Sequence, residues 1–297
     1  MKEKVKCKKC GLLIDKDCET CPYCGYKQND GSDIPTINEE KVDPLNPNTK
    51  IFNTEKLHFF DFASRELSIK TWKSITFFLV GFLGLNLIAT IISLFTSIFG
   101  QYYFLSTSAS SAAINFSCYL TIFACIFIIL GNNFYDYIKE FKGAKTWIYG
   151  LSFGFLLIIA SSAVSSFFGL FQETSSSNQN EQAIDSVTTL YPVLSLLIFG
   201  IVGPLCEEFT YRVGLFTALK KRNRVAAYLI TAFLFGFIHF TVNSDNLLNE
   251  FLNLPSYIVA GLLLCYFYDY KGVGVSSIAH ITNNFVALLI QIVYSYF

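Results

Sequence analysis

Long apolar blocks alternate with short polar connections along most of this chain. Seven such blocks follow the first quarter of the sequence, and a membrane-spanning helix needs about 20 mostly apolar residues. Because apolar runs of this length favour spanning helices over strands, the pattern predicts an all-α polytopic membrane protein with about seven transmembrane helices. The blocks are residues 75–99, 110–131, 147–171, 190–219, 225–242, 255–270 and 273–294.

Composition supports a membrane protein. The chain is 53% hydrophobic and only 15% charged, whereas soluble domains carry roughly a quarter of charged residues. The fourth block is long and contains Gly203-Pro204. We expect a kink there, because neighbouring helices in a bundle can satisfy the backbone groups that proline frees.

The basic residues are distributed unevenly, although the net charge is zero. Of the 22 Lys and Arg, 13 precede the first block, and only Arg212 lies inside a block. Every second connection is basic and the others contain no Lys or Arg, so the positive-inside rule predicts a cytoplasmic N-terminus and an external C-terminus. No signal peptide is visible, and we expect an integral protein of a bacterial plasma membrane. The basic connections contain Lys139, Lys142 and Lys145, then Lys220, Lys221, Arg222 and Arg224, and finally Lys271.

Cysteines gather at the N-terminus in two Cys-x-x-Cys-Gly turns, formed by Cys7 and Cys10 and by Cys21 and Cys24. Four thiolates in this spacing predict a tetrahedral structural zinc site, so residues 1–25 are expected to form a zinc ribbon. Cys18 leaves some ambiguity in the register, and disulfides are the less favoured alternative on the cytoplasmic side. A ribbon of this kind typically serves as a folding unit or a docking surface for a protein partner, and no nucleic acid is expected.

The segment between the ribbon and the first span, residues 26–72, is rich in Asn, Asp, Pro and Lys and reads as a linker. Its aromatic end is expected to form an interfacial helix. Residues 73–146 then supply two accessory transmembrane helices. Asn86 and Asn115 are single polar residues on these two helices, and the sequence offers them no partner.

Ionisable residues occur inside three of the later blocks. Glu207, Glu208 and Arg212 lie in the fourth, His239 in the fifth and His280 in the seventh. Such groups cost roughly 2.5–3.5 kcal/mol each on membrane-insertion scales and commonly mark functional sites. The sequence therefore predicts a polar site within the bundle.

The spacings place these groups together. His280 and Asn284 are four residues apart and are expected to share a helix face. Counted from the connection after the fourth block, Glu207 and His239 lie roughly 20–25 Å along their helices, and His280 and Asn284 lie roughly 12–18 Å from the start of theirs. Three helices are thus expected to bring these side chains to similar depths.

Two chemistries fit this set. A carboxylate beside a histidine can activate water, while Asn284 and a second imidazole hold a developing oxyanion. Alternatively, His239, His280 and one glutamate could ligate a catalytic zinc ion, although the chain contains no His-Glu-x-x-His motif.

The order of three motifs on separate helices resembles the CAAX-protease and bacteriocin-processing family, over about residues 147–297. The resemblance implies an intramembrane protease domain with Glu207 as catalytic base, His239 as its partner, and His280 and Asn284 near the oxyanion. It further implies that Glu208 and Arg212 form a supporting pair. The motifs are Glu207-Glu208-x-x-x-Arg212, Phe235-x-x-x-His239 and His280-x-x-x-Asn284.

The expected function is therefore that of an endopeptidase acting on a membrane-associated, lipidated or leader-type peptide. A non-catalytic membrane binding or immunity protein on the same scaffold is the alternative. A transporter is a third possibility, because buried charges also mark ion pathways, but no repeat of helical halves is visible.

Overall fold

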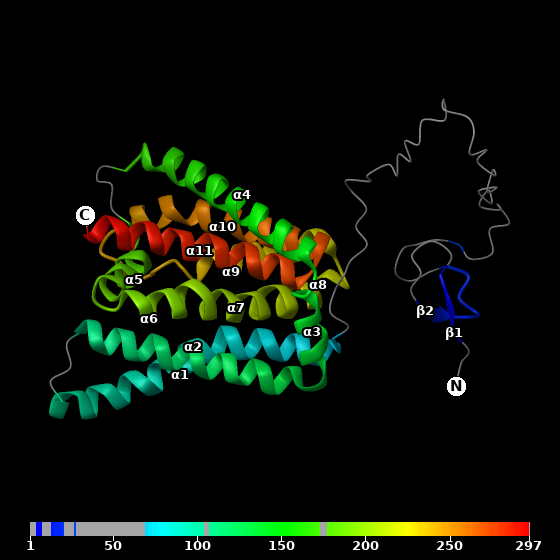
Figure 1. Cartoon of the computed structure of the whole chain (residues 1–297), viewed down its shortest axis with the longest axis horizontal. Helices are drawn as coiled ribbons and strands as arrows, with labels where there is room; N and C mark the ends of the chain where they lie inside the picture. The colour runs from blue at the N-terminus through cyan, green and yellow to red at the C-terminus, as the bar shows by residue number, and fades with distance from the viewer. Residues whose placement is uncertain are drawn as a thin grey trace, which may run out of the picture. The chain divides into compact units, whose positions relative to one another are not determined.

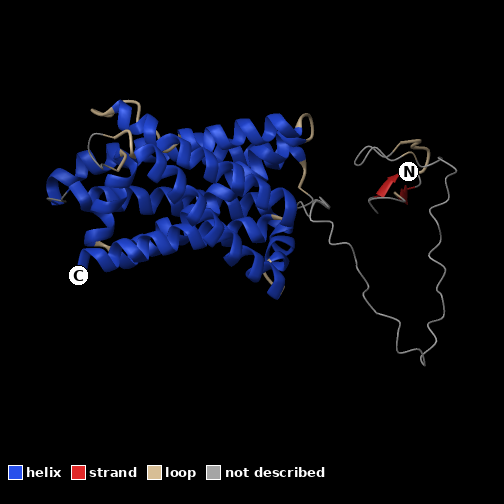
Figure 2. Ribbon diagram, turned by 90° about the horizontal axis from the view of Figure 1, so that it is seen from above, coloured by secondary structure: helices blue, strands red, loops and turns tan. Residues whose placement is uncertain are grey.

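The computed structural model describes residues 4–7, 13–20, 27, 69–103, 107–172 and 177–296. The chain divides into two compact units, Met1–Ala63 and Ser64–Phe297. Each unit is described separately. Among the described residues, strands occur only in the first unit, and the second is helical (Figure 2).

The first unit contains a short antiparallel hairpin of β1 (Lys4–Lys6) and β2 (Leu13–Asp15), in which Val5 faces Ile14. The Cys7 side chain is buried beside Ile14. Three of the four expected zinc ligands (Cys10, Cys21 and Cys24) lie outside the described residues, as does nearly all of the expected linker and interfacial helix. The zinc ribbon therefore stays a prediction.

The second unit is a bundle of helices that run roughly parallel or antiparallel to one another (Figure 1). Its first half consists of α1 (Thr71–Tyr103), α2 (Thr107–Leu130), the 3₁₀ turn η1 (Gly131–Asn133), α3 (Phe134–Glu140), α4 (Ala144–Gly169) and α5 (Gln179–Leu190). Its second half consists of α6 (Pro192–Leu197), η2 (Ile198–Val202), α7 (Gly203–Glu207), η3 (Glu208–Phe216), α8 (Thr217–Lys220), α9 (Arg224–Phe237), α10 (Leu247–Lys271) and α11 (Val273–Tyr296).

Six helices in the described part of the chain are long and apolar enough to cross a membrane. Together with their composition they make the chain an integral membrane protein. The fifth expected span is shorter than predicted, because α9 has only 14 residues. At about 1.5 Å per residue it reaches about 21 Å, less than the roughly 30 Å of a bilayer core. The expectation of a full spanning helix over 225–242 is thus wrong in length.

The chain nevertheless passes from one end of the bundle to the other at this point. Arg224, at the start of α9, bonds to Asp269 near the end of α10 with an N–O distance of 2.6 Å. The Thr241 backbone N–H, beyond α9, donates to Glu250 near the start of α10 at 3.0 Å. α9 and residues 238–246 together therefore traverse the bundle, and the predicted alternation of connections survives.

The basic connections gather at one end of the helical unit. Lys73 at the start of α1 donates to the Leu130 carbonyl oxygen at the end of α2, at 2.9 Å. Lys220 likewise pairs with Asp269 at 2.5 Å. In Figure 1 this end carries α3 and α8, whereas α5 lies at the opposite end. The charge asymmetry is thus a property of the folded bundle, and the orientation relative to a membrane stays a prediction.

The fourth expected span is a continuous helical path from Pro192 to Lys220 that contains two π-helical segments. The first segment, η2, ends directly before Gly203-Pro204. Proline lacks the N–H that an α-helix requires, so the wider π-turn accommodates the irregularity predicted there. Glu207 is the last residue of α7 and Glu208 the first of η3, so both acids lie where the helix changes its pitch.

Close contacts between helices fix this distorted path. α1 lies against η3, where Gly81 faces the buried side chain of Thr210. Thr210 is held in place because its hydroxyl donates to the Cys206 carbonyl oxygen at 2.7 Å. On the opposite side of the bundle, α4 approaches α11 through Gly150 and Gly154.

Substitution of Gly81 by alanine should destabilise the bundle. The added methyl would lie 2.6 Å from the Thr210 Cβ, which is far inside van der Waals contact. Overpacking of this kind costs about 1–3 kcal/mol, so we expect a lower thermal unfolding midpoint for the purified protein in detergent micelles. Gly84→Ala is the matched control, because the nearest atom to its added methyl is 4.0 Å away. Equal midpoints for the two variants would contradict this packing.

Candidate active site

A cavity of about 520 Å³ lies inside the bundle. Its walls come from α1, α2, α4, α5, the distorted helix 192–220, α10, α11 and the end of α9 with the turn after it. Glu207, His239, His280 and Asn284 all line it. The four residues expected to form one polar site therefore all border one cavity.

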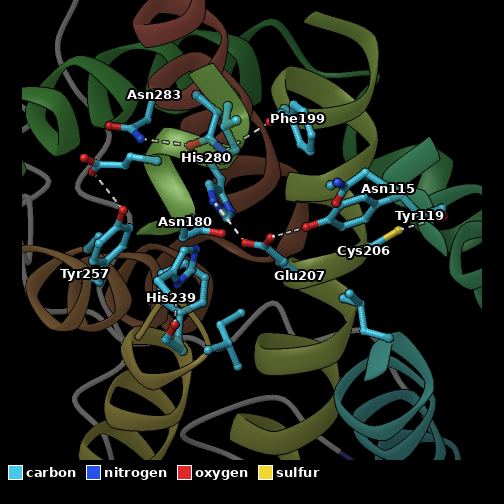
Figure 3. A pocket seen from close by; sticks show the side chains of 18 of the residues that line it. Asn115, Tyr119, Asn180, Phe199, Cys206, Glu207, His239, Tyr257, His280 and Asn283 are labelled. Atoms are coloured by element: carbon cyan, nitrogen blue, oxygen red, sulfur yellow. Dashed lines mark hydrogen bonds and ion pairs between the residues drawn. The ribbon is translucent and has the colours of Figure 1, made fainter. Parts of the chain in front are cut away.

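Glu207 occupies the centre of this group (Figure 3). One carboxylate oxygen, Oε2, lies 3.6 Å from Nε2 of His280. The other, Oε1, accepts a long hydrogen bond of 3.4 Å from the hydroxyl of Tyr119 on α2. The side chain is only 8% exposed. Contacts with two helices therefore orient the carboxylate that borders the cavity.

His280 is held from behind by a buried ion pair. Its Nδ1 lies 3.0 Å from Oε1 of Glu208, and the same oxygen lies 3.1 Å from Nη1 of Arg212. Because a carboxylate only accepts, Nδ1 carries the proton and Nε2 is directed to Glu207. The Arg212 guanidinium also stacks 4.3 Å from the ring centre of Phe235. Glu208 and Arg212 are fully buried and do not line the cavity.

His239 reaches the cavity from a turn and not from a helix. The α9 helix ends at Phe237, and His239 lies in the turn that follows, with its ring centroid 5.3 Å from that of Phe235. The ring is nevertheless fixed, since Nδ1 lies 2.9 Å from the Phe235 carbonyl oxygen. This oxygen only accepts, so Nδ1 donates and a neutral ring keeps Nε2 free of a proton. The ring also stacks on Tyr257, with centroids 4.3 Å apart and planes inclined by 14°.

Tyr257 connects His239 to α5, a helix at one end of the cavity. Its hydroxyl donates to Oε1 of Glu181 at 2.8 Å and accepts from Nδ2 of Asn178 at 3.2 Å. Burial raises the pKa of the Glu181 carboxyl, and the hydrogen bond from Tyr257 opposes that shift. Glu250 on α10 also bonds α5, because its carboxylate accepts a hydrogen bond from the Gln179 backbone N–H at 2.9 Å. His239 is thus packed against Tyr257, whose hydrogen bonds extend to α5.

Asn284 lies one helical turn beyond His280 on α11. Its Nδ2 donates to the Phe199 carbonyl oxygen in the π-helical segment η2, at 3.2 Å. Its Oδ1 accepts from the neighbouring Asn283 at 3.0 Å. One of its two N–H donors is therefore engaged with the distorted helix, which fixes the amide at the cavity wall.

Several cavity residues were not singled out from the sequence. Tyr119, Glu181 and Tyr257 lie in segments that read only as spans or as a connection. Asn86 and Asn115 stand out in the sequence as isolated polar residues, and both line the cavity. An isolated asparagine in an apolar helix therefore indicates a cavity position from sequence, whereas a tyrosine in such a helix does not.

A metal site requires several His, Cys, Asp or Glu side chains around one point. In the described part of the chain, no three His, Cys, Asp or Glu side chains are arranged so that they could hold one ion together. His239, His280 and Glu207 border one cavity but do not form such a ligand set.

Part of the chain is similar to a known protein family. Residues 189–286 match the family described as "Type II CAAX prenyl endopeptidase Rce1-like". The matched stretch contains Glu207, His239, His280 and Asn284. The resemblance inferred from the three motifs is confirmed as a similarity to Rce1-like CAAX prenyl endopeptidases. The accessory helices α1 and α2 lie outside it.

Two curated proteins are similar over part of the chain. The "Putative membrane peptidase YdiL" of Bacillus subtilis is 29% identical over 136 residues, which cover 45% of this chain and 50% of that protein. The "UPF0177 protein YvdC" of Lactococcus lactis is 24% identical over 86 residues, which cover 29% of this chain and 33% of that protein. The matches thus span half or less of these relatives. No solved structure matches the chain significantly.

Removal of Arg212 should destabilise the site strongly. Arg212→Leu leaves the buried Glu208 carboxylate without its cation, and breaking a buried pair in this way costs about 3–5 kcal/mol. We expect a large drop in the thermal unfolding midpoint in detergent micelles. The double variant Glu208→Gln/Arg212→Leu should recover much of it, because no charge is left unpaired. A double variant no more stable than Arg212→Leu would contradict the pairing.

Proposed function

We propose that this chain is an intramembrane endopeptidase that hydrolyses a peptide bond of a membrane-associated, lipidated or leader-type peptide. The observation that carries the proposal is the convergence of Glu207, His239, His280 and Asn284 on one cavity among membrane-length helices. The match of residues 189–286 to CAAX prenyl endopeptidases supports the same class of reaction.

In the proposed reaction, Glu207 and His239 activate a water molecule in the cavity. The carboxylate takes a proton from water as the oxygen attacks the carbonyl carbon of the peptide bond. The unprotonated Nε2 of His239 accepts the second hydrogen bond of that water and orients it. Glu207 later gives its proton to the departing amine as the C–N bond breaks, so atoms and charge balance over the cycle.

The negative charge on the former carbonyl oxygen needs donors. Asn284 has a second N–H besides the one bound to Phe199, and His280 can donate from Nε2 when both of its nitrogens carry a proton. The ring lies between the two acids, with Nε2 3.6 Å from Oε2 of Glu207 and Nδ1 3.0 Å from Oε1 of Glu208. Donors fixed by α11 before the reaction cost no reorganisation during it.

Glu207→Gln tests the proposal. The amide keeps the size of the side chain but cannot take a proton, so we expect cleavage to fall by about a thousandfold or more. The measurement compares protein N-termini and released peptides in membranes of cells that contain wild type or variant at matched levels. Asp245→Asn, which changes an exposed acid outside the cavity, is the control and should leave the cleavage products unchanged.

A product that is lost only in Glu207→Gln would support the peptidase and name its substrate and cleaved bond. If no product depends on Glu207, the peptidase proposal fails, and the non-catalytic binding or immunity protein becomes the better account of the scaffold.

We also propose that Cys7, Cys10, Cys21 and Cys24 bind one structural zinc ion, because their spacing matches a closed four-thiolate site. Elemental analysis of the purified full chain should then find about one zinc per molecule, and Cys10→Ala should lose it. Cys18→Ala is the matched control and should retain the metal. Loss of zinc from the Cys18 variant alone would overturn the assignment of ligands.

A further inference from the structure

The two accessory helices supply one wall of the cavity, although they lie outside the family match. Gly81, Phe82, Leu85 and Asn86 on α1, and Asn115, Tyr119 and Ile122 on α2, border the same space as Glu207. Figure 3 shows Asn115 and Tyr119 reaching toward the site from one helix. These apolar helices therefore present two carboxamides to the space in which a substrate would lie.

The orientation of the two amides follows from their hydrogen bonds. Nδ2 of Asn86 donates to the Phe82 carbonyl oxygen at 3.3 Å, and Nδ2 of Asn115 donates to the Ser111 carbonyl oxygen at 2.9 Å. A carbonyl oxygen only accepts, so in each side chain the amino group faces its own helix and Oδ1 remains available as an acceptor. Polar residues in membrane helices commonly bond a neighbouring helix. In the described part of the chain, neither amide bonds a neighbouring helix. A ligand in the cavity would give each Oδ1 a hydrogen-bond donor.

The remaining polar groups make the cavity poor in positive charge. Glu181, Asp185 and Glu207 border it, and no Lys or Arg is found among the described residues of its lining. A free carboxylate entering this space would meet acceptors and other carboxylates. A peptide main chain offers N–H donors instead, and inside a membrane every such donor must find an acceptor.

We propose that α1 and α2 form a subsite for an extended internal segment of the peptide substrate, in which Oδ1 of Asn86 and Asn115 accept hydrogen bonds from main-chain N–H groups. The inference rests on the proposed peptidase function. It adds that the enzyme takes a peptide whose terminal carboxylate lies away from the cleaved bond, and that residues outside the matched 189–286 stretch select it.

The first test measures cleavage of the substrate identified through Glu207→Gln, by the full chain in lipid vesicles. Asn86→Leu and Asn115→Leu keep the approximate side-chain volume but remove the acceptor. We expect each to raise KM about tenfold with kcat nearly unchanged. Thr90→Val and Thr121→Val are controls on the same helices, because their exposed hydroxyls donate to backbone carbonyl oxygens of the same helix, those of Asn86 and Ser117. Unchanged KM in both asparagine variants would overturn the subsite.

The same assay tests whether cleavage requires a free carboxylate at the end of the substrate peptide. A substrate peptide that ends three residues after the cleaved bond is compared as free acid and as terminal amide. The amide should be cleaved at least as fast, because no Lys or Arg among the described residues lines the cavity to pair with the acid. A requirement for the free acid would overturn the inference.

A second test does not depend on cleavage. Photoreactive benzoylphenylalanine is placed at Phe82, which lines the cavity, and at Phe95, which is exposed on the same helix, both in the Glu207→Gln background. Position 82 should capture a peptide and position 95 only lipid. Capture of a peptide at 82 without any cleavage by wild type would preserve the subsite and refute the peptidase. Capture of lipid alone, or of nothing, at 82 would refute the subsite.

Discussion

The buried chain of Arg212, Glu208 and His280 is the interaction on which the rest of the site depends. Charges with 0% exposure are tolerable only when they are paired, because desolvation otherwise costs several kcal/mol per ion. The pair joins η3 to α11 through the 3.0 Å contact between Glu208 and Nδ1 of His280. Pairing therefore does more than remove a penalty, since it fixes the tautomer and direction of the imidazole that faces Glu207.

Glu207 and Glu208 serve different partners, because adjacent residues on a helix point about 100° apart. They are adjacent in sequence, yet Glu208 is directed to the buried arginine and Glu207 to the cavity. The change from α7 to the π-helical η3 occurs between them, and π-segments commonly mark functional positions in helices. The close approach of α1 at Gly81 leaves this helix no room to shift, so packing of an accessory helix keeps the acids in place.

Much of this arrangement could be predicted from sequence, because long apolar runs and isolated charges have few alternative explanations in a membrane. Helical rise alone led us to expect Glu207, His239, His280 and Asn284 near one another, and all four line one cavity. The polar start of α10 could not be predicted from hydropathy. Residues 247–254 include buried Asn249 and Glu250, which are tolerated because tertiary hydrogen bonds to residues 177, 179 and 241 satisfy them.

The same reasoning explains why α5 and the turn at His239 were missed. A short polar helix outside the spans looks like a connection, because its stability comes from partners that are distant in sequence. Glu181 and Asn178 bond Tyr257 some 76 to 79 residues away, and Tyr257 in turn supplies the surface on which His239 stacks. Displacement of α5 would break these bonds and release one face of the histidine ring. The position of α5 and the position of His239, which we propose activates water, are therefore linked.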